Sequence, residues 1–153
     1  MLTAIDNLLQ LISQKKAEGK KIVFTNGCFD ILHSGHVRYL NEAKSLGDIL
    51  IIGLNSDSSV KRLKGEDRPI NNEEDRAIVL SGLRAVDYVV LFNENTPYKL
   101  ISLILPDVLV KGGDWKQEEI VGYDIVKKNG GEVVSSSYYD GKSTSRIIAK
   151  VKD

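Results

Sequence analysis

The chain has two histidines, and they lie three residues apart in the segment His33-Ser34-Gly35-His36. An imidazole titrates near neutral pH, and a phosphate beside it favours the charged form, in which both ring nitrogens are donors. Gly35 lets a ligand approach the backbone closely. If a helix begins near Gly35, both rings can face the same pocket. We therefore expect an anion site here, and the alternative is a pair of surface or helix-capping histidines.

The residues around the histidines have the pattern of a strand, a turn and a helix. Residues 22–24 are apolar and predict a buried strand. From about Gly35 apolar residues such as Val37 and Leu40 recur at helical spacing, until Gly47 ends the helix. Such a turn directs several backbone N–H groups and the positive end of the helix dipole at one place. This indicates a phosphate site.

A cation follows the predicted start of the last helix. Ser143 or Thr144 is expected to cap this helix, and Asp140-Gly141 predicts the turn before it. Arg146 stands three residues after Ser143, where a positive charge is unfavourable unless an anion is bound. This favours a phosphate-binding helix start over a purely structural cap.

The ends of two other predicted strands carry residues that suit a ligand. Asn55 and Asp57 follow residues 49–54, and Gly112-Gly113 follows residues 107–110. Open α/β sheets bind ligands at this edge, although ordinary turns and helix caps use the same residue types. Residues 60–72 hold a basic cluster. A solvated surface loop is the usual interpretation of such a charge run, and the alternative is a flexible loop that supplies positive charge over a phosphate.

The segment from Gly27 to His36, Gly-Cys-Phe-Asp-Ile-Leu-His-Ser-Gly-His, resembles the GxFDxxHxGH signature of the cytidylyltransferase-like nucleotidyltransferases. A second signature of that superfamily, a Ser/Thr-rich start of the last helix, resembles Ser143-Thr144-Ser145-Arg146-Ile147-Ile148. Members join a nucleoside triphosphate to a phosphorylated small molecule and release pyrophosphate. The resemblance therefore implies an enzyme of this type.

Within the superfamily, the chain from about residue 20 onward most resembles the heptose 1-phosphate adenylyltransferases. This likeness implies transfer of AMP from ATP to a sugar 1-phosphate, D-glycero-β-D-manno-heptose 1-phosphate, giving ADP-heptose and pyrophosphate for lipopolysaccharide or related glycan synthesis. The stretches that carry it are Asn55-Ser56-Asp57, Lys61-Arg62-Leu63-Lys64-Gly65, Arg68-Pro69 and Leu109-Val110-Lys111-Gly112-Gly113-Asp114.

The resemblance implies a role for each matching residue. The catalytic residues, which hold the phosphates, are His33, His36, Lys64 (or Lys61) and Arg146. The nucleotide-binding residues are Asn26, Gly27, Cys28, Phe29, Gly35, Lys111, Gly112, Asp114, Ser143, Thr144 and Ser145. The substrate-binding residues are Asp30, Asn55, Asp57, Lys61, Arg68 and Arg76. Mg²⁺ is expected as a cofactor bound through the phosphates, without assigned protein ligands.

Two further helices are predicted over residues 73–83 and 96–105, and the first of them carries Arg76. By its position alone, Arg76 is an ordinary salt-bridge partner on the helix predicted over residues 73–83. Thr96 is expected to cap a helix that has Pro97 at its first position. The apolar residues of the helix over 73–83 that we expect to be buried are Ala77, Val79, Leu80 and Leu83.

Short apolar segments alternate with predicted helices, which indicates a right-handed, doubly wound α/β fold with a parallel sheet. The predicted strands cover residues 22–24, 49–54, 88–92, 107–110 and 133–134. The predicted helices cover residues 35–47, 73–83, 96–105 and 117–128, with a last helix from residue 143. The resemblance implies a Rossmann-like, five-stranded nucleotidyltransferase order, with the site between the first and fourth strands.

The bulk composition fits one domain of 153 residues, in which an amphipathic helix within residues 1–19 precedes a catalytic core over 20–153. The helix is expected to pack on its own domain. The formal charge is zero, so a nucleic-acid or membrane partner is not expected. One cysteine, Cys28, excludes an intramolecular disulfide. With no long apolar run and no signal peptide, we expect a cytoplasmic protein, and the resemblance implies a homodimer or homotetramer.

Other functions fit the sequence less closely. A glycerol 3-phosphate-type or phosphoethanolamine cytidylyltransferase, or an FAD synthetase-like adenylyltransferase, would keep the same signature. A non-catalytic nucleotide sensor would bind ATP without releasing pyrophosphate, although the intact His33 and His36 argue against it. A NAD-dependent dehydrogenase fits poorly, because the first turn lacks the GxGxxG pattern.

Overall fold

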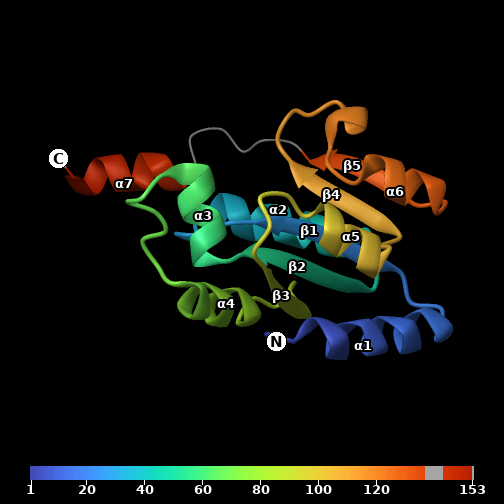
Figure 1. Ribbon diagram of the computed structural model, residues 1–153. Coiled ribbons are helices and arrows are strands. Elements are labelled where there is room, and N and C mark those ends of the chain that lie inside the picture. The colour runs from blue at the N-terminus through green and yellow to red at the C-terminus, as the bar shows by residue number, and fades with distance from the viewer. Residues whose placement is uncertain (137–142, 153) are drawn as a thin grey trace.

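The computed structural model describes residues 1–136 and 143–152. Its centre is a five-stranded, fully parallel sheet with the strand order β3-β2-β1-β4-β5 (Figure 1). The strands are β1 (Ile22–Gly27), β2 (Ile49–Asn55), β3 (Tyr88–Phe92), β4 (Val108–Gly112) and β5 (Glu132–Ser136). Every residue of β2 is buried, as expected for a strand covered on both faces. The predicted doubly wound parallel fold is confirmed.

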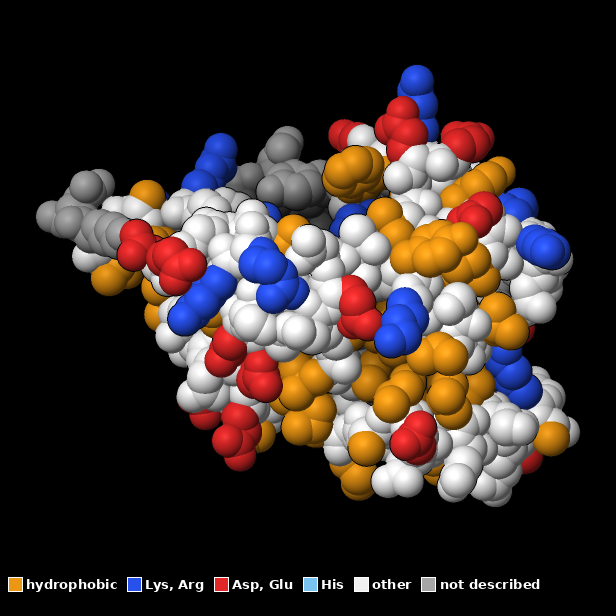
Figure 2. Space-filling view, viewed as in Figure 1, with side chains coloured by type: hydrophobic (Ala, Val, Ile, Leu, Met, Phe, Trp, Pro, Cys, Tyr) orange, Lys and Arg blue, Asp and Glu red, His pale blue; other side chains and the backbone are white. Residues whose placement is uncertain are grey.

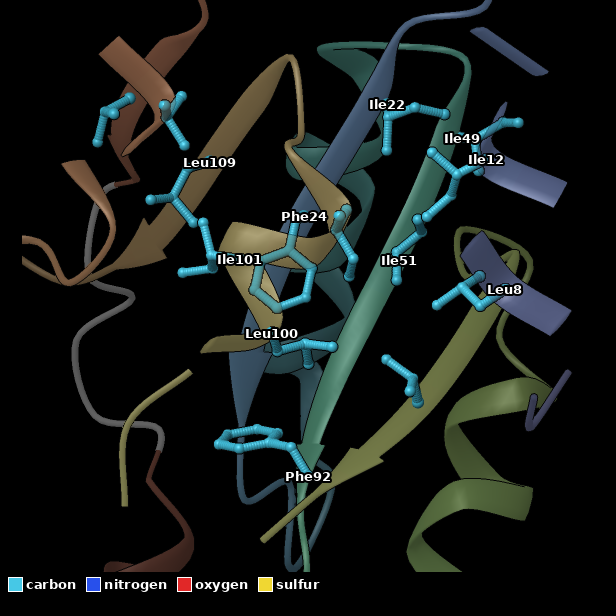
Figure 3. Packing of buried hydrophobic residues seen from close by; sticks show 14 of the residues in the cluster. Leu8, Ile12, Ile22, Phe24, Ile49, Ile51, Phe92, Leu100, Ile101 and Leu109 are labelled. Atoms are coloured by element: carbon cyan, nitrogen blue, oxygen red, sulfur yellow. The ribbon is translucent and has the colours of Figure 1, made fainter. Parts of the chain in front are cut away.

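Helices cover both faces of this sheet. On one face, α1 (Ile5–Ala17), α5 (Tyr98–Ile104) and α6 (Tyr123–Lys128) contribute to a hydrophobic cluster around Phe24, and Figure 3 shows Leu8 and Ile12 of α1 beside Ile49 and Ile51. On the other face, α2 (Ser34–Ser45) and α4 (Glu73–Ser81) contribute to a second cluster. Because Leu8 and Ile12 are buried, the prediction that α1 packs on its own domain is confirmed.

The strand order creates the place for a ligand. From β1 the chain continues to β2 and β3 on one side, whereas β4 and β5 lie on the other side. The connections after β1 and β4 therefore leave in opposite directions and open a crevice at the carboxyl ends of these two strands. α3 (Asp57–Lys64) follows β2 at this edge, and α7 (Thr144–Lys152) also begins there, next to Ile31.

Three predicted local structures are wrong. Residues 60–64 belong to the helix α3 and not to a flexible loop, because Ser56 caps α3 by accepting a hydrogen bond from the N–H of Ser59. The helix predicted over 117–128 is interrupted: Gln117–Glu119 forms one turn of 3-10 helix, and α6 begins only after Gly122, whose φ is 91°. α5 begins at Tyr98 with Pro97 as its cap residue, so Thr96 does not cap it.

The buried face of α4 also differs from the prediction. Val79 is 54% exposed, whereas Arg76, Ala77 and Leu80 are buried. The long side chain of Arg76 turns inward, so the helix presents a different face to the sheet. The predicted turn at residues 140–141 lies outside the described residues.

Candidate active site

A cavity of about 630 Å³ opens at the carboxyl edge of the sheet, between β1 and β4. The predicted site residues that line it are Asn26, Gly27, Cys28, Phe29, Asp30, His33, Gly35, His36, Asn55, Lys64, Arg68, Lys111, Gly112, Ser143, Thr144 and Ser145. The predicted residues outside its lining are Asp57, Lys61, Arg76, Asp114 and Arg146. The structure thus gathers segments from most of the chain into one site.

The two histidines lie together at the start of α2. His33 is the N-cap residue and has an extended backbone, and His36 lies in the first turn of the helix. Their rings stack with centroids 3.9 Å apart, and the ring of Phe29 lies 5.3 Å from that of His36. Nδ1 of His36 is buried with no hydrogen-bond partner among the described residues. The prediction that both rings face one pocket is confirmed.

Burial, with a further contribution from His33, lowers the pKa of His36 to about 4. Without a bound anion, His36 is therefore neutral at pH 7. An anionic phosphate in the cavity would act in the opposite direction and raise this pKa, because it stabilises the imidazolium form. Phosphate binding and protonation of His36 should then favour each other.

This pKa makes the stability of the protein without bound phosphate depend on pH. A histidine in the unfolded chain titrates near about 6.5, so between there and about pH 4 the unfolded state binds a proton that the folded state excludes. We expect the free energy of unfolding to fall as the pH falls through this window, and to fall less in His36→Gln. Urea unfolding at several pH values measures it. Identical pH profiles for the two proteins would contradict the buried, neutral His36.

Two lysines contribute positive charge to the cavity. Lys64 ends α3 and is exposed, whereas Lys111 in β4 is half-buried. Burial lowers the pKa of Lys111, and the charge of Lys64 acts in the same direction. An anion between these amines would relieve both effects. Of the two lysines that we considered for the phosphates, Lys64 lines the cavity and Lys61 does not.

The start of α7 is the second helix N-terminus at the cavity. The backbone N–H of Arg146 donates to Oγ of Ser143 at 3.2 Å, so Ser143 caps the helix as predicted. Oγ1 of Thr144 donates to the carbonyl of Ile31 at 3.0 Å and ties α7 to the turn before the histidines. Both helix starts thus border the same space, and their dipoles favour an anion there.

Asp30 holds the segment after α3 beside the cavity. Its carboxylate accepts hydrogen bonds from Nε of Arg68 at 2.6 Å and from the backbone N–H groups of Ile70 and Asn71, each at 2.9 Å. Burial acts to raise the pKa of Asp30, but these hydrogen bonds outweigh it and the net shift is downward. Asp30 is therefore ionised, and it orients Arg68 at the cavity wall.

Arg76 lies behind the cavity and not in it. Its side chain is fully buried, and it donates to the carbonyls of Cys28 and Asn71 at 2.6 and 3.0 Å and to the carboxylate of Asp57 at 2.8 Å. Arg76 and Asp57 bind each other and lie outside the cavity lining, so their contact with the ligand stays a prediction. Arg76 instead joins the loop before the histidines to the start of α4.

Some lining residues were not predicted to lie at the site: Tyr39, Leu63, Asn95, Thr96, Pro97 and Val121. Gly113, which was predicted with Gly112 at the ligand end of a strand, also lines the cavity. Tyr39 projects from α2, hydrogen-bonds with Thr25, and donates to the carbonyl of Val110 at 3.2 Å. Burial raises its pKa to about 12, so it stays a neutral phenol. Among these residues, the polar run Asn95-Thr96-Pro97 had a signal in the sequence, because it follows a strand at the edge of the sheet where ligands bind.

The described residues contain no group of three or more His, Cys, Asp or Glu side chains placed to hold a metal ion. Asp30 is the carboxylate in the cavity lining, and both of its oxygens already accept hydrogen bonds. The described residues therefore do not fit a protein-held Mg²⁺.

No helix in the described part of the chain is long and apolar enough to span a membrane.

The chain is similar to known proteins along most of its length. The cytidylyltransferase-like family matches residues 24–150. The bifunctional protein HldE of Wolinella succinogenes is 60% identical over 147 residues, which are 96% of this chain and 30% of that protein. The protein of the same name from Campylobacter concisus is 60% identical over 152 residues, 99% of this chain and 31% of that protein. The chain thus spans about a third of the length of these relatives.

Two crystal structures have a similar fold. The lipopolysaccharide core biosynthesis protein from Thermoplasma volcanium is 35% identical with a TM-score of 0.65, and the match covers 80% of this chain and 100% of that one. A pantoate–β-alanine ligase from Francisella tularensis, with a TM-score of 0.63, covers 95% of this chain and 69% of its own. At 17% identity the second likeness shows the fold alone.

Proposed function

The chain belongs to the cytidylyltransferase-like family of nucleotidyltransferases, and we propose that it transfers AMP from ATP to a sugar 1-phosphate, D-glycero-β-D-manno-heptose 1-phosphate, giving ADP-heptose and pyrophosphate. The observation that carries this proposal is that His33, His36 and the start of α7 line one cavity. Lys64, Arg68 and Lys111 give this cavity its positive charge. The relative named as a lipopolysaccharide core biosynthesis protein supports a product of the nucleotide-sugar class.

The proposed reaction is a single in-line displacement. A phosphate oxygen of the sugar 1-phosphate forms a bond to the α-phosphorus of ATP. The bond from that phosphorus to the bridging oxygen of the β-phosphate breaks, and pyrophosphate leaves with the electron pair. The attacking phosphate is already largely ionised at neutral pH, so no general base has to remove a proton. Catalysis then consists of positioning and charge stabilisation.

In this proposal, different residues of the cavity bind different phosphate groups of the two substrates. His33 and His36 donate to the oxygens of the α-phosphate and the bridging position, where negative charge grows. Lys64, Lys111 and the N-terminus of α7 hold the β,γ-phosphates as they leave. Arg68, oriented by Asp30, faces the acceptor phosphate. Mg²⁺, carried by the phosphates, would neutralise part of their charge.

Ser143→Ala should mainly weaken ATP binding. The substitution removes the cap of α7 and loosens the helix start that faces the phosphates. We expect the dissociation constant for ATP to rise by about tenfold, and kcat at saturating ATP to change by less than about twofold. Calorimetric titration and steady-state kinetics measure the two quantities. The control is Ser102→Ala, on the exposed side of α5, which should leave both unchanged. A loss confined to kcat would contradict the assignment.

The matching family is described as cytidylyltransferase-like, which favours one alternative. This alternative is a cytidylyltransferase that uses CTP and a polyol phosphate such as glycerol 3-phosphate. Pyrophosphate release, measured for each nucleoside triphosphate against a panel of phosphorylated sugars and polyols, distinguishes the two. Release with ATP and heptose 1-phosphate alone supports the proposal. Release with CTP and a polyol phosphate moves the substrate while keeping the mechanism. Tight ATP binding without release from any pair would support a nucleotide sensor instead.

A further inference from the structure

The two strands that border the cavity, β1 and β4, are paired with each other only near their amino ends. The last paired residues are Phe24 and Leu109. Beyond them β1 stays paired with β2, and β4 with β5, as far as the end of each strand. The carboxyl ends of β1 and β4 therefore lie on either side of the crevice without sheet pairing between them. Their separation has to be fixed by another contact.

Tyr39 of α2 makes such a contact. Its hydroxyl donates to the carbonyl of Val110 at 3.2 Å and hydrogen-bonds with Oγ1 of Thr25. A phenol has one proton to donate, so the hydroxyl of Thr25 is the donor to Tyr39. Thr25 and Val110 are the first residues beyond the paired segment, and both are buried. The ring also lies against β4, because a Cβ on Gly112 would be 3.4 Å from it.

Tyr39 lies on the helix that carries the histidines. It follows His36 by three residues, so the two side chains lie on the same side of α2. The carbonyl that Tyr39 holds belongs to Val110, the residue before Lys111. One side chain thus connects the helix that presents His36 with the strand that presents Lys111.

The position of Lys111 needs this support. Basic side chains lie over α3 (Figure 2), and Lys64 at the end of that helix lines the same cavity as Lys111. The two amines repel each other when both are charged, and this repulsion contributes to the lowered pKa of Lys111. Because β1 does not pair with this end of β4, the sheet alone does not oppose a movement of Lys111 away from the cavity.

We propose that Tyr39 is a positioning residue that fixes the width of the crevice between β1 and β4, and thereby the place of Lys111 relative to His33 and His36. The phosphates of one nucleotide then meet the histidines and Lys111 without rearrangement of the protein. This consequence for AMP transfer rests on the proposed function, whereas the fixed width does not.

Hydrogen exchange of the nucleotide-free protein tests the fixed width. In Tyr39→Phe, which keeps the ring, we expect the amides of residues 110–112 to exchange about tenfold faster or more, because the end of β4 can move away from β1. The amides of β2 and β3 should stay within about twofold of wild type. A uniform rise over the whole sheet would reflect lost stability alone and would overturn the proposal.

Thr25→Val is the matched control. It removes the other hydroxyl of the pair but keeps the hydrogen bond from Tyr39 to Val110, so exchange at residues 110–112 should change by less than about threefold. If circular dichroism shows that Tyr39→Phe does not fold, the double variant with Thr25→Val takes its place. The double variant removes both hydroxyls and leaves fewer buried groups without a partner.

Kinetics test whether the width matters to the reaction. Tyr39→Phe should lower kcat for AMP transfer by about tenfold and raise the dissociation constant for ATP by less than about threefold, because a flexible triphosphate can adapt when it binds but not in the transition state. In a Lys111→Met background, the same substitution should lower kcat by less than about a further twofold, since Tyr39 acts through Lys111. A second tenfold loss there would contradict the positioning role.

These experiments separate the inference from the proposed function. A wild-type protein that transfers no AMP contradicts the proposed function, and hydrogen exchange then decides the role of Tyr39 by itself. Unchanged exchange at residues 110–112 in Tyr39→Phe would overturn the inference even in a protein that transfers AMP.

Discussion

His36→Ala should lower turnover by about 10³-fold while changing the folded structure little. The ring of His36 stacks on His33 with its Nδ1 buried at the cavity, so it is the side chain best placed to donate to a phosphate as charge builds up. It is only partly buried, and alanine suits a helix, so the loss of stability should be small. Pyrophosphate release under saturating substrates gives kcat.

The matched control is Val37→Ala. Val37 follows His36 in the same helix turn and is 38% exposed, so its truncation disturbs the helix without touching the cavity. We expect near-normal turnover in this variant. If His36→Ala also retains near-normal turnover, the assignment of the phosphates to the histidine pair is wrong.

Arg76→Met should destabilise the protein by about 3 kcal/mol. The substitution keeps an unbranched apolar stem but removes three hydrogen bonds, two of them to the carbonyls of Cys28 and Asn71. The carboxylate of Asp57 is 35% exposed and regains water, which limits the loss. Urea unfolding gives the change in the free energy of unfolding when both proteins are fitted with the same dependence of that free energy on urea concentration.

The control is the same substitution at Arg84, an exposed arginine that follows α4. Arg84→Met should change the free energy of unfolding by no more than about 0.5 kcal/mol. Equal urea midpoints for the two variants would show that Arg76 does not hold the loops together. A large loss of ATP affinity in Arg76→Met without loss of stability would restore its earlier interpretation as a ligand-facing residue.

The histidine site could be predicted from the sequence because its information is local. A short apolar strand, a glycine-bearing turn and a helical period stand within one stretch of the chain, and local geometry then places His33 and His36 together. The fold class followed in the same way from alternating segments. Ser143 as a helix cap is a further local feature that the structure confirms.

The roles of Arg76 and Tyr39 could not be predicted, because they depend on partners distant in the sequence. Arg76 turns inward to meet the carbonyl of Cys28, and Tyr39 reaches the carbonyl of Val110. Neither acceptor carries a signal in the sequence, since every residue has a carbonyl. Lys61 and Asp114 matched the resemblance but lie outside the cavity lining, so a motif match alone did not place them.

The most direct test of the account is product analysis by mass spectrometry after incubation with ATP and D-glycero-β-D-manno-heptose 1-phosphate. The account predicts ADP-heptose and pyrophosphate in equal amounts from the wild-type protein, and neither product from His36→Ala. A wild-type protein that binds ATP tightly but forms no nucleotide sugar, or that forms a cytidylyl product while rejecting ATP, would contradict it.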